Sequence, residues 1–181
     1  MDQGCLIAVV GASGVGKDSI IAGVVESLPD IVLTRRVITR APGLSSEDHI
    51  AVTSAEFDQA RARGEFCLHW RAHGLEYGIP QHVLLDVKAN ERCLANLSRS
   101  VLAQADEIFP HLIVLNVVAS AEAIAQRLSN RGRESDAEIS SRLARSTYPL
   151  PDKLNFHQIN NDGPLNTAVD QAVQLLSFKS K

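Results

Sequence analysis

The segment 5–19, CLIAVVGASGVGKDS, constrains the fold of this chain more than any other stretch. An unbroken apolar run leads into a glycine-rich turn, and Gly11, Gly16 and Lys17 fit the spacing G-x-x-x-x-G-K of a phosphate-binding loop. Glycine lets the backbone curl around a phosphate and turn its N–H groups inward, and the helix that begins at Lys17 adds the positive end of its dipole. The segment therefore predicts a buried strand, a nucleotide phosphate loop and a helix, in that order.

The predicted loop supplies the candidate ATP and metal ligands. Lys17 is expected to meet the β- and γ-phosphates. Asp18 stands where Ser or Thr normally reaches Mg²⁺, and because a carboxylate is also a hard oxygen ligand, Asp18 and Ser19 are both candidate metal ligands. A tight strand-to-helix turn with an exposed lysine is the alternative, which the flanking segments disfavour. The ATP-binding candidates in the loop are Gly11, Ala12, Ser13, Gly14, Val15, Gly16, Lys17, Asp18 and Ser19.

Composition limits the class of protein. A chain of 181 residues with 45% hydrophobic content is long enough for one well-packed domain. The net charge of −3 argues against bulk nucleic-acid binding. The N-terminal segment predicts neither a signal peptide nor a membrane span, so we expect a cytoplasmic protein without nucleic-acid or membrane partners. Three widely spaced cysteines in apolar surroundings, Cys5, Cys67 and Cys93, predict buried reduced thiols.

Alternating strands and helices predict an α/β protein, a single domain over 1–181 with three layers and a mostly parallel sheet around the phosphate loop. The core is expected over 1–30 and 82–181, with a small strand-rich insertion over 31–81. Core strands are predicted at 5–10, 83–87, 111–119 and 156–160, and core helices at 17–28, 91–105, 120–130, from 135 and from 164. In the insertion, strands are predicted at 31–38, 49–53, 65–70 and 75–77, and a capping box of Thr53 and Glu56 predicts a helix to about residue 63.

This assignment of strands and helices makes one aspartate a candidate metal ligand. Asp86 lies at the end of the predicted buried strand 83–87, and an acid across from a phosphate loop commonly orients Mg²⁺ or its water shell. Asp86 is therefore a third candidate metal ligand. A strand-end or helix-capping aspartate without a ligand is the alternative.

Two clusters of arginine lie where a phosphate loop needs partners. The planar guanidinium fork pairs with two phosphate oxygens at once. The first cluster is Arg35, Arg36 and Arg40; the second is Arg127, Arg131, Arg133, Arg142 and Arg145. The second cluster predicts an arginine-bearing helical lid over about 129–146 that closes over ATP, with a solvated helix face as the alternative.

Arg35 and Arg36 point to opposite faces if their segment is a strand, so only one of them faces the cleft. Arg36 shares its parity with Arg40. We therefore expect Arg36, rather than Arg35, to face the cleft on the same side as Arg40.

The chain resembles the guanylate kinase family over nearly its whole length. The shared motifs are GASGVGK, Thr39-Arg40-x-Pro42, Phe57, Gly64-x-Phe66, Trp70, Tyr77-Gly78, Arg127-Leu128-x-x-Arg131 and Ile139-x-x-Arg142-Leu143. The resemblance implies a three-layer P-loop kinase fold, and because the inserted segment holds the acceptor nucleotide in that family, it implies an acceptor-binding insertion over 31–81. The groups that read guanine are missing, because Gly43, His49, His69 and Ile79 replace the Arg, Tyr, Glu and Thr of that family. Guanine recognition is therefore not expected.

The replacements resemble the ribose 1,5-bisphosphate phosphokinases. The shared strings are GKDS, Arg35-Arg36-x-Ile38-Thr39-Arg40, Ser46-Glu47-Asp48-His49 and Trp70-x-Ala72-His73-Gly74-Leu75-x-Tyr77-Gly78. The resemblance implies ATP-dependent phosphorylation of ribose 1,5-bisphosphate to 5-phosphoribosyl 1-diphosphate (PRPP) in phosphonate utilisation. That family tends to carry Asn-Gly-Ser-Arg after its third main strand. Residues 86–89, which follow the predicted strand here, read Asp-Val-Lys-Ala and depart from that pattern.

The chemistry of such a substrate agrees with the residues present. Ribose 1,5-bisphosphate carries two phosphates and no base, and its 1-phosphate is already an ionised nucleophile, so catalysis reduces to alignment and charge neutralisation. We expect ATP and Mg²⁺ as cofactors. We expect Lys17, Arg131 and Arg142 to act in catalysis and Arg127 to bind ATP. Arg36 and Arg40 are expected to bind the acceptor phosphates. The candidates for binding the sugar or a phosphate are His49, His69, His73 and Tyr77.

Three other interpretations stay open. The chain is compatible with a guanylate or other nucleoside-monophosphate kinase, and with a non-catalytic guanylate-kinase-like binding module, although the intact Gly16-Lys17 and the arginines disfavour the module. A kinase of an unphosphorylated sugar would need a carboxylate base, for which Glu47 or Asp48 is available. The expected partner is a small phosphosugar, and a homodimer is left open.

Overall fold

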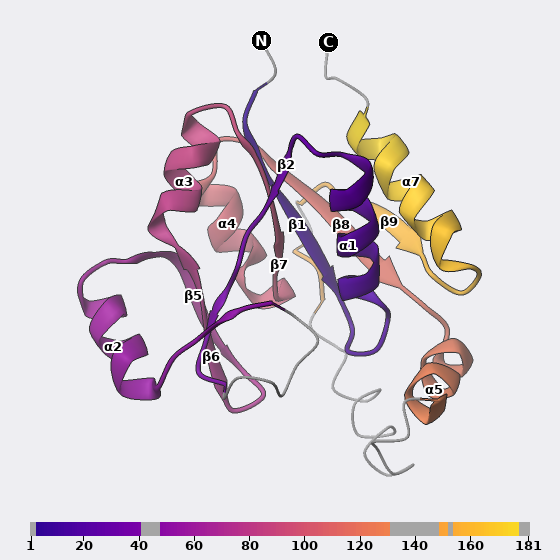
Figure 1. The fold of residues 1–181 in the computed structure, drawn as a ribbon, viewed down its shortest axis with the longest axis horizontal. Helices are drawn as coiled ribbons and strands as arrows, with labels where there is room; N and C mark the ends of the chain where they lie inside the picture. Colours follow the sequence, from indigo (N-terminus) through magenta and orange to yellow (C-terminus); the bar gives the residue numbers. More distant parts are fainter. Residues whose placement is uncertain (1–2, 41–47, 131–148, 152–153, 178–181) are drawn as a thin grey trace.

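Five strands pair side by side in parallel in the central sheet of the computed structural model (Figure 1). The structure describes residues 3–40, 48–130, 149–151 and 154–177. In spatial order the strands are β2 (Ile31–Leu33), β7 (Arg92–Asn96), β1 (Cys5–Gly11), β8 (Leu112–Val118) and β9 (His157–Asn160). The predicted parallel sheet is confirmed, with β1 at its centre.

Helices cover both faces of this sheet, as predicted for three layers (Figure 1). One face packs against α1 (Lys17–Ser27), α5 (Ala121–Asn130) and α7 (Leu165–Ser177). The other packs against α3 (Gln81–Lys88) and α4 (Leu102–Ile108), which follows a short 3₁₀ turn η1 (Arg99–Val101). Successive strand residues point to opposite faces, so both faces of β1 are apolar and buried.

A second sheet of four short strands lies in the predicted acceptor-binding insertion, which we call the acceptor segment. Its spatial order is β4 (Ile50–Ala51), β3 (Val37–Ile38), β6 (Leu75–Pro80) and β5 (Phe66–Ala72), and α2 (Ser54–Ala62) lies between β4 and β5 in the chain. A two-residue turn, His73-Gly74, joins β5 to β6, and both residues have positive φ (52° and 73°), as a type I′ hairpin requires. The predicted hairpin and strand-rich insertion are confirmed, but β2 pairs with β7 in the main sheet, so the insertion begins after Leu33 rather than at residue 31.

The prediction of a buried strand at 83–87 is wrong, because this segment lies in α3. Val83, Leu84 and Val87 are buried at helical spacing, while Leu85 is 57% exposed, which a doubly covered strand would not allow. A short apolar run without alternation is compatible with either element.

The prediction of one helix over 91–105 is also wrong. Residues 92–96 form β7, and helix begins only with η1 and α4. The buried run Cys93-Leu94-Ala95 pairs with β1 on one side and, through its first members, with β2 on the other. Leucine and alanine favour helices in isolation, but pairing within a sheet decides here.

The remaining predicted core elements agree with the structure to within a few residues. All three cysteines are buried, as predicted, and none forms a disulfide. None of the helices in the described ranges has the length and apolar character needed to cross a membrane. The helix predicted from residue 135, with most of the predicted lid, lies outside the described residues.

The capping box predicted for α2 is present. The Thr53 hydroxyl accepts from the Glu56 N–H at 3.2 Å, and the Glu56 carboxylate accepts from the Thr53 N–H at 2.7 Å. The Thr53 N–H and, as the smaller effect, the Thr53 hydroxyl both donate to the Glu56 carboxylate. These two hydrogen bonds hold the pKa of Glu56 below its usual value.

Substituting Thr53→Ala is expected to lower the free energy of unfolding by about 1 kcal/mol, because the Glu56 N–H loses its acceptor. Thr53→Ser keeps the hydroxyl and is the control, with a much smaller loss. A carboxylate with a lowered folded-state pKa stabilises above the pKa of the unfolded chain, and this contribution disappears as pH falls through the folded-state pKa. Urea titrations should therefore show the difference between wild type and Thr53→Ala shrinking under acidic conditions; an equal difference at all pH values would contradict the role of Glu56.

Candidate active site

The phosphate loop follows β1 and is shaped by two glycines that no other residue replaces without strain. Gly11 has φ +152°, and a Cβ there would lie 2.4 Å from the Val117 carbonyl oxygen of β8. Gly16 has φ +93°, and a Cβ there would lie 2.4 Å from the amide nitrogen of Asn161. The loop thus packs closely against the end of β8 at Gly11 and against the segment after β9 at Gly16. Only glycine, which has no Cβ, allows the backbone to come this close at both positions.

Lys17, the first residue of α1, reaches back over the loop. Its ammonium donates to the carbonyl oxygens of Gly11 and Ala12, both at 2.9 Å. These bonds hold the cation beside the loop that would carry the phosphates. The arrangement agrees with the predicted role of Lys17 at the β- and γ-phosphates.

Asn161 anchors the loop from the opposite side, and sequence reasoning missed it. Its side chain is 2% exposed and donates to the Val15 carbonyl oxygen at 2.7 Å. The backbone carbonyl oxygen of Asn161 accepts a hydrogen bond from the Arg127 guanidinium at 2.6 Å. Arg127, a predicted ATP ligand, is therefore held next to the phosphate loop by the segment that follows β9.

Asp18 is the best placed of the three predicted metal ligands. Its carboxylate accepts from the Asn96 side-chain amide at 3.2 Å, at the end of β7, while Ser19 lines a groove between α1 and α7 together with Glu26 and Asn166. No group of three or more His, Cys, Asp and Glu side chains gathers in the described part of the chain. A magnesium ion here would thus take most of its ligands from phosphate oxygens and water, which is how Mg²⁺ usually binds with nucleotides.

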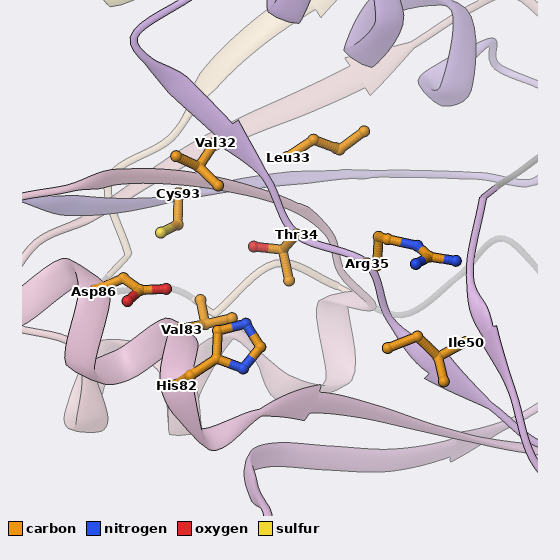
Figure 2. Close-up of a pocket in the computed structure, with 9 residues that line it drawn as sticks. All are labelled: Val32, Leu33, Thr34, Arg35, Ile50, His82, Val83, Asp86 and Cys93. Carbon is orange, nitrogen blue, oxygen red and sulfur yellow. The ribbon is translucent and has the colours of Figure 1, made fainter.

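Asp86 does not lie with the phosphate loop, and its predicted metal role is wrong. Asp86 lies on α3 and, with Thr34, His82 and Cys93, lines a cavity of about 180 Å³. Figure 2 shows these side chains around it. Cys93 pairs with Leu6, near the start of β1, whereas the phosphate loop follows Gly11. Five residues of strand span roughly 16 Å, so Asp86 lies at the other end of the sheet from the phosphates.

In the acceptor segment, Arg36, Arg40 and Tyr77 come together. Arg36 is only 8% exposed, and its guanidinium carbon lies 5.0 Å from the ring centroid of Tyr77 and 5.9 Å from that of Trp70. The two rings stack at 5.3 Å, and a guanidinium nitrogen of Arg40 lies 3.5 Å from the Tyr77 hydroxyl oxygen. Arg35 instead points outward and pairs with Asp48 at 2.9 Å. The preference for Arg36 over Arg35 agrees with this geometry.

The predicted histidine ligands do not share this position. His69 is exposed and pairs in register with Gly78, one residue from the Trp70–Tyr77 pair, so it projects from the opposite face of the hairpin. His73 is exposed in the hairpin turn. His49 is half-buried immediately before β4. The two predicted catalytic lid arginines, Arg131 and Arg142, lie outside the described residues.

The corrected position of β7 reveals a motif that the sequence assignment missed. Residues 96–99, which begin with the last residue of this strand, read Asn-Leu-Ser-Arg, close to the Asn-Gly-Ser-Arg expected after the third main strand. Asn96 bonds to Asp18, and Arg99 donates to the side-chain oxygen of Asn116 at 2.9 Å. The departure noted at residues 86–89 therefore came from a misplaced strand.

The cysteines are not candidate nucleophiles. Burial raises the pKa of Cys67 to about 11, and burial together with nearby carboxylates raises that of Cys93 to about 11. Thiols of such high pKa are inert near neutral pH. The chemistry available at the site is phosphate binding by lysine and arginine.

No protein-family model matches the chain. It is 45% identical over 175 residues to a ribose 1,5-bisphosphate phosphokinase PhnN of Ruegeria sp. (strain TM1040), covering 96% of this chain and 92% of that protein. It is 40% identical over 180 residues to a protein of the same name from Thiobacillus denitrificans (strain ATCC 25259 / T1), covering 98% and 95%. A crystal structure of guanylate kinase from Anaplasma phagocytophilum is similar, with a TM-score of 0.72 and 20% identity over 99% of this chain and 88% of that one.

The guanylate kinase likeness shows the fold alone at this identity, whereas the other two relatives match nearly their whole length. The departures from guanylate kinases in the acceptor segment, and the Asn-Leu-Ser-Arg motif at the end of β7, also favour the ribose 1,5-bisphosphate phosphokinases over the guanylate kinases. The chain therefore belongs to the ribose 1,5-bisphosphate phosphokinase family.

Proposed function

We propose that this protein uses MgATP to phosphorylate ribose 1,5-bisphosphate at its 1-phosphate, giving PRPP and ADP, in phosphonate utilisation. The observation that carries the proposal is the acceptor cluster of Arg36, Arg40 and Tyr77. Its buried guanidinium is suited to a phosphate rather than to the edge of a base.

The transfer itself needs little from the protein beyond alignment. An oxygen of the 1-phosphate attacks the γ-phosphorus, the bond from that phosphorus to the β,γ-bridging oxygen breaks, and ADP leaves with the electron pair. The attacking oxygen is ionised at neutral pH, so no side chain has to remove a proton. Lys17 compensates charge on the β- and γ-phosphates, and Mg²⁺ bound through Asp18 would supply further charge compensation there.

The arginines complete this charge compensation. We assign Arg127 to ATP, because it is tied to the segment that holds the phosphate loop. Arg131 and Arg142 are proposed to reach the transferring phosphoryl group from the lid. We further propose that the protein is cytoplasmic. A homodimer stays a prediction.

Guanylate kinase activity is the second candidate, and the acceptor segment disfavours it. Ile79 stands where the resemblance expects a threonine hydroxyl, and its side chain is fully buried. His69, in place of the expected glutamate, projects from the opposite face of the hairpin to Trp70 and Tyr77. A site that lacks the hydrogen-bonding groups for a base loses discrimination steeply.

One assay tests the proposal directly. Purified protein with MgATP is offered ribose 1,5-bisphosphate and GMP in parallel, and ADP, PRPP and GDP are followed. We expect PRPP from the first acceptor and a much lower kcat/KM with GMP. Comparable efficiency with GMP would overturn the proposed function, and no turnover of either would favour the binding module.

Substituting Lys17→Ala is expected to reduce kcat by about 100-fold or more, because the cation at the β- and γ-phosphates is lost. The matched control is Lys88→Ala, at the end of α3, which should keep near-normal turnover. Both variants should unfold at close to the wild-type temperature in circular dichroism. Near-normal turnover in folded Lys17→Ala would contradict its role.

Adjacent arginines provide an internal control for the acceptor site. Arg36→Ala is expected to raise KM for ribose 1,5-bisphosphate by about 10-fold or more, since a charge-assisted hydrogen bond to phosphate is lost. Arg35→Ala removes only an exposed pair with Asp48 and should change KM less than about threefold. Steady-state kinetics at saturating ATP measure both, and equal effects of the two substitutions would argue against the cluster as the acceptor site.

A further inference from the structure

A polar pair, Arg99 and Asn116, lies on the face of the main sheet that the acceptor segment covers. Val114 of β8 packs in the same buried cluster as Trp70 and Tyr77 of the acceptor segment. Asn116 is two residues further along the strand, so its side chain points to the same face, where it is 5% exposed. Its side-chain oxygen accepts from Arg99 at 2.9 Å. An otherwise apolar layer thus carries a guanidinium at its edge.

This pair lies at the base of the phosphate loop. Asn116 pairs with Val10, the residue before Gly11, so its strand ends beside the start of the loop. Arg99 comes from the other side of β1, just after β7, where the Leu97 N–H donates to the Val9 carbonyl oxygen at 3.0 Å. The guanidinium of Arg99 therefore reaches across the end of β1, beneath the phosphate loop and on the side of the acceptor segment.

The position is costly for a cation. Burial lowers the pKa of Arg99, although an arginine stays charged at neutral pH. Its neighbours in the chain at positions 97, 101 and 102 are buried and apolar. The planar fork of a guanidinium fits two oxygens of a phosphate, the kind of anion that this edge of the sheet has to hold.

We propose that Arg99 binds the 1-phosphate of the acceptor, the group whose oxygen attacks ATP, and that Asn116 orients the guanidinium. The inference rests on the proposed function. The attacking oxygen has to lie about 3–3.5 Å from the γ-phosphorus, hence at the loop that follows Gly11 and on its acceptor side. Arg36 and Arg40, on the second sheet, are then left for the remainder of the phosphosugar, including its 5-phosphate.

Ribose 5-phosphate makes this assignment testable, because it lacks the 1-phosphate. In Arg99→Ala, KM for ribose 1,5-bisphosphate is expected to rise about 10-fold or more, whereas the inhibition constant of ribose 5-phosphate and KM for ATP change less than twofold. Arg36→Ala should weaken both sugar phosphates. The matched control is Arg92→Ala at the other end of β7, where the guanidinium bonds to Asp30 and to the Leu176 carbonyl, both at 2.6 Å; it affects stability only.

Two further variants separate binding from folding. Arg99→Lys keeps the charge without the fork and should give an intermediate rise in KM, which decides the comparison if Arg99→Ala does not fold. Asn116→Ala should raise KM for ribose 1,5-bisphosphate on its own but add little in the Arg99→Ala background, because it acts through Arg99.

The outcomes distinguish this inference from the proposed function. Wild-type turnover of ribose 1,5-bisphosphate with an unchanged KM in folded Arg99 variants overturns the inference alone. A rise in KM for ATP, or equal weakening of ribose 5-phosphate, assigns Arg99 to another phosphate and also overturns it. Absence of wild-type turnover overturns both.

Discussion

The site depends on the parallel register of β1 with β7 and β8. Parallel strands bring their carboxyl ends to one edge, and here Asn96, Gly11 and Asn116 reach that edge on three adjacent strands. The phosphate loop can leave β1 only by passing within van der Waals distance of the β8 backbone, and glycine at position 11 permits this approach. Lys17 and Asp18, which we assign to the donor phosphates and their magnesium ion, are both held at this edge.

Asn161 completes the support of the loop from a distant part of the sequence. Its side chain holds the Val15 carbonyl and its backbone holds Arg127, so one segment after β9 couples the loop to α5. The Ser120 N–H, before α5, also donates to Asp162 at 2.6 Å. A phosphate loop fixed on both sides is pre-organised, and little reorganisation is then needed when charge develops during transfer.

Local signals were predictable from the sequence and contacts between distant segments were not. The loop, the capping box at Thr53 and the turn at His73-Gly74 each depend on a few neighbouring residues of special chemistry. The segments 83–87 and 92–96 are both short apolar runs, and which of them enters the sheet depends on pairing with β1. Exchanging them moved Asp86 to the wrong end of the sheet and concealed Asn96 and Arg99. Asn161 offered no local signal, because its role exists only through Val15 and Gly16.

The distribution of charge at the sheet edge follows from the substrate that we propose. MgATP and a sugar bisphosphate together bring a large negative charge to one cleft, and each phosphate monoester carries about −1.5 to −2. A second carboxylate beside Asp18 would add repulsion there, whereas Asn96 is neutral and donates to the Asp18 carboxylate. In the acceptor segment, the cost of burying Arg36 is reduced by the faces of Tyr77 and Trp70, contacts worth about 0.5–2 kcal/mol. Both rings meet the guanidinium of Arg36 and stack on each other, so they act as support for a charge rather than as a surface on which a base stacks.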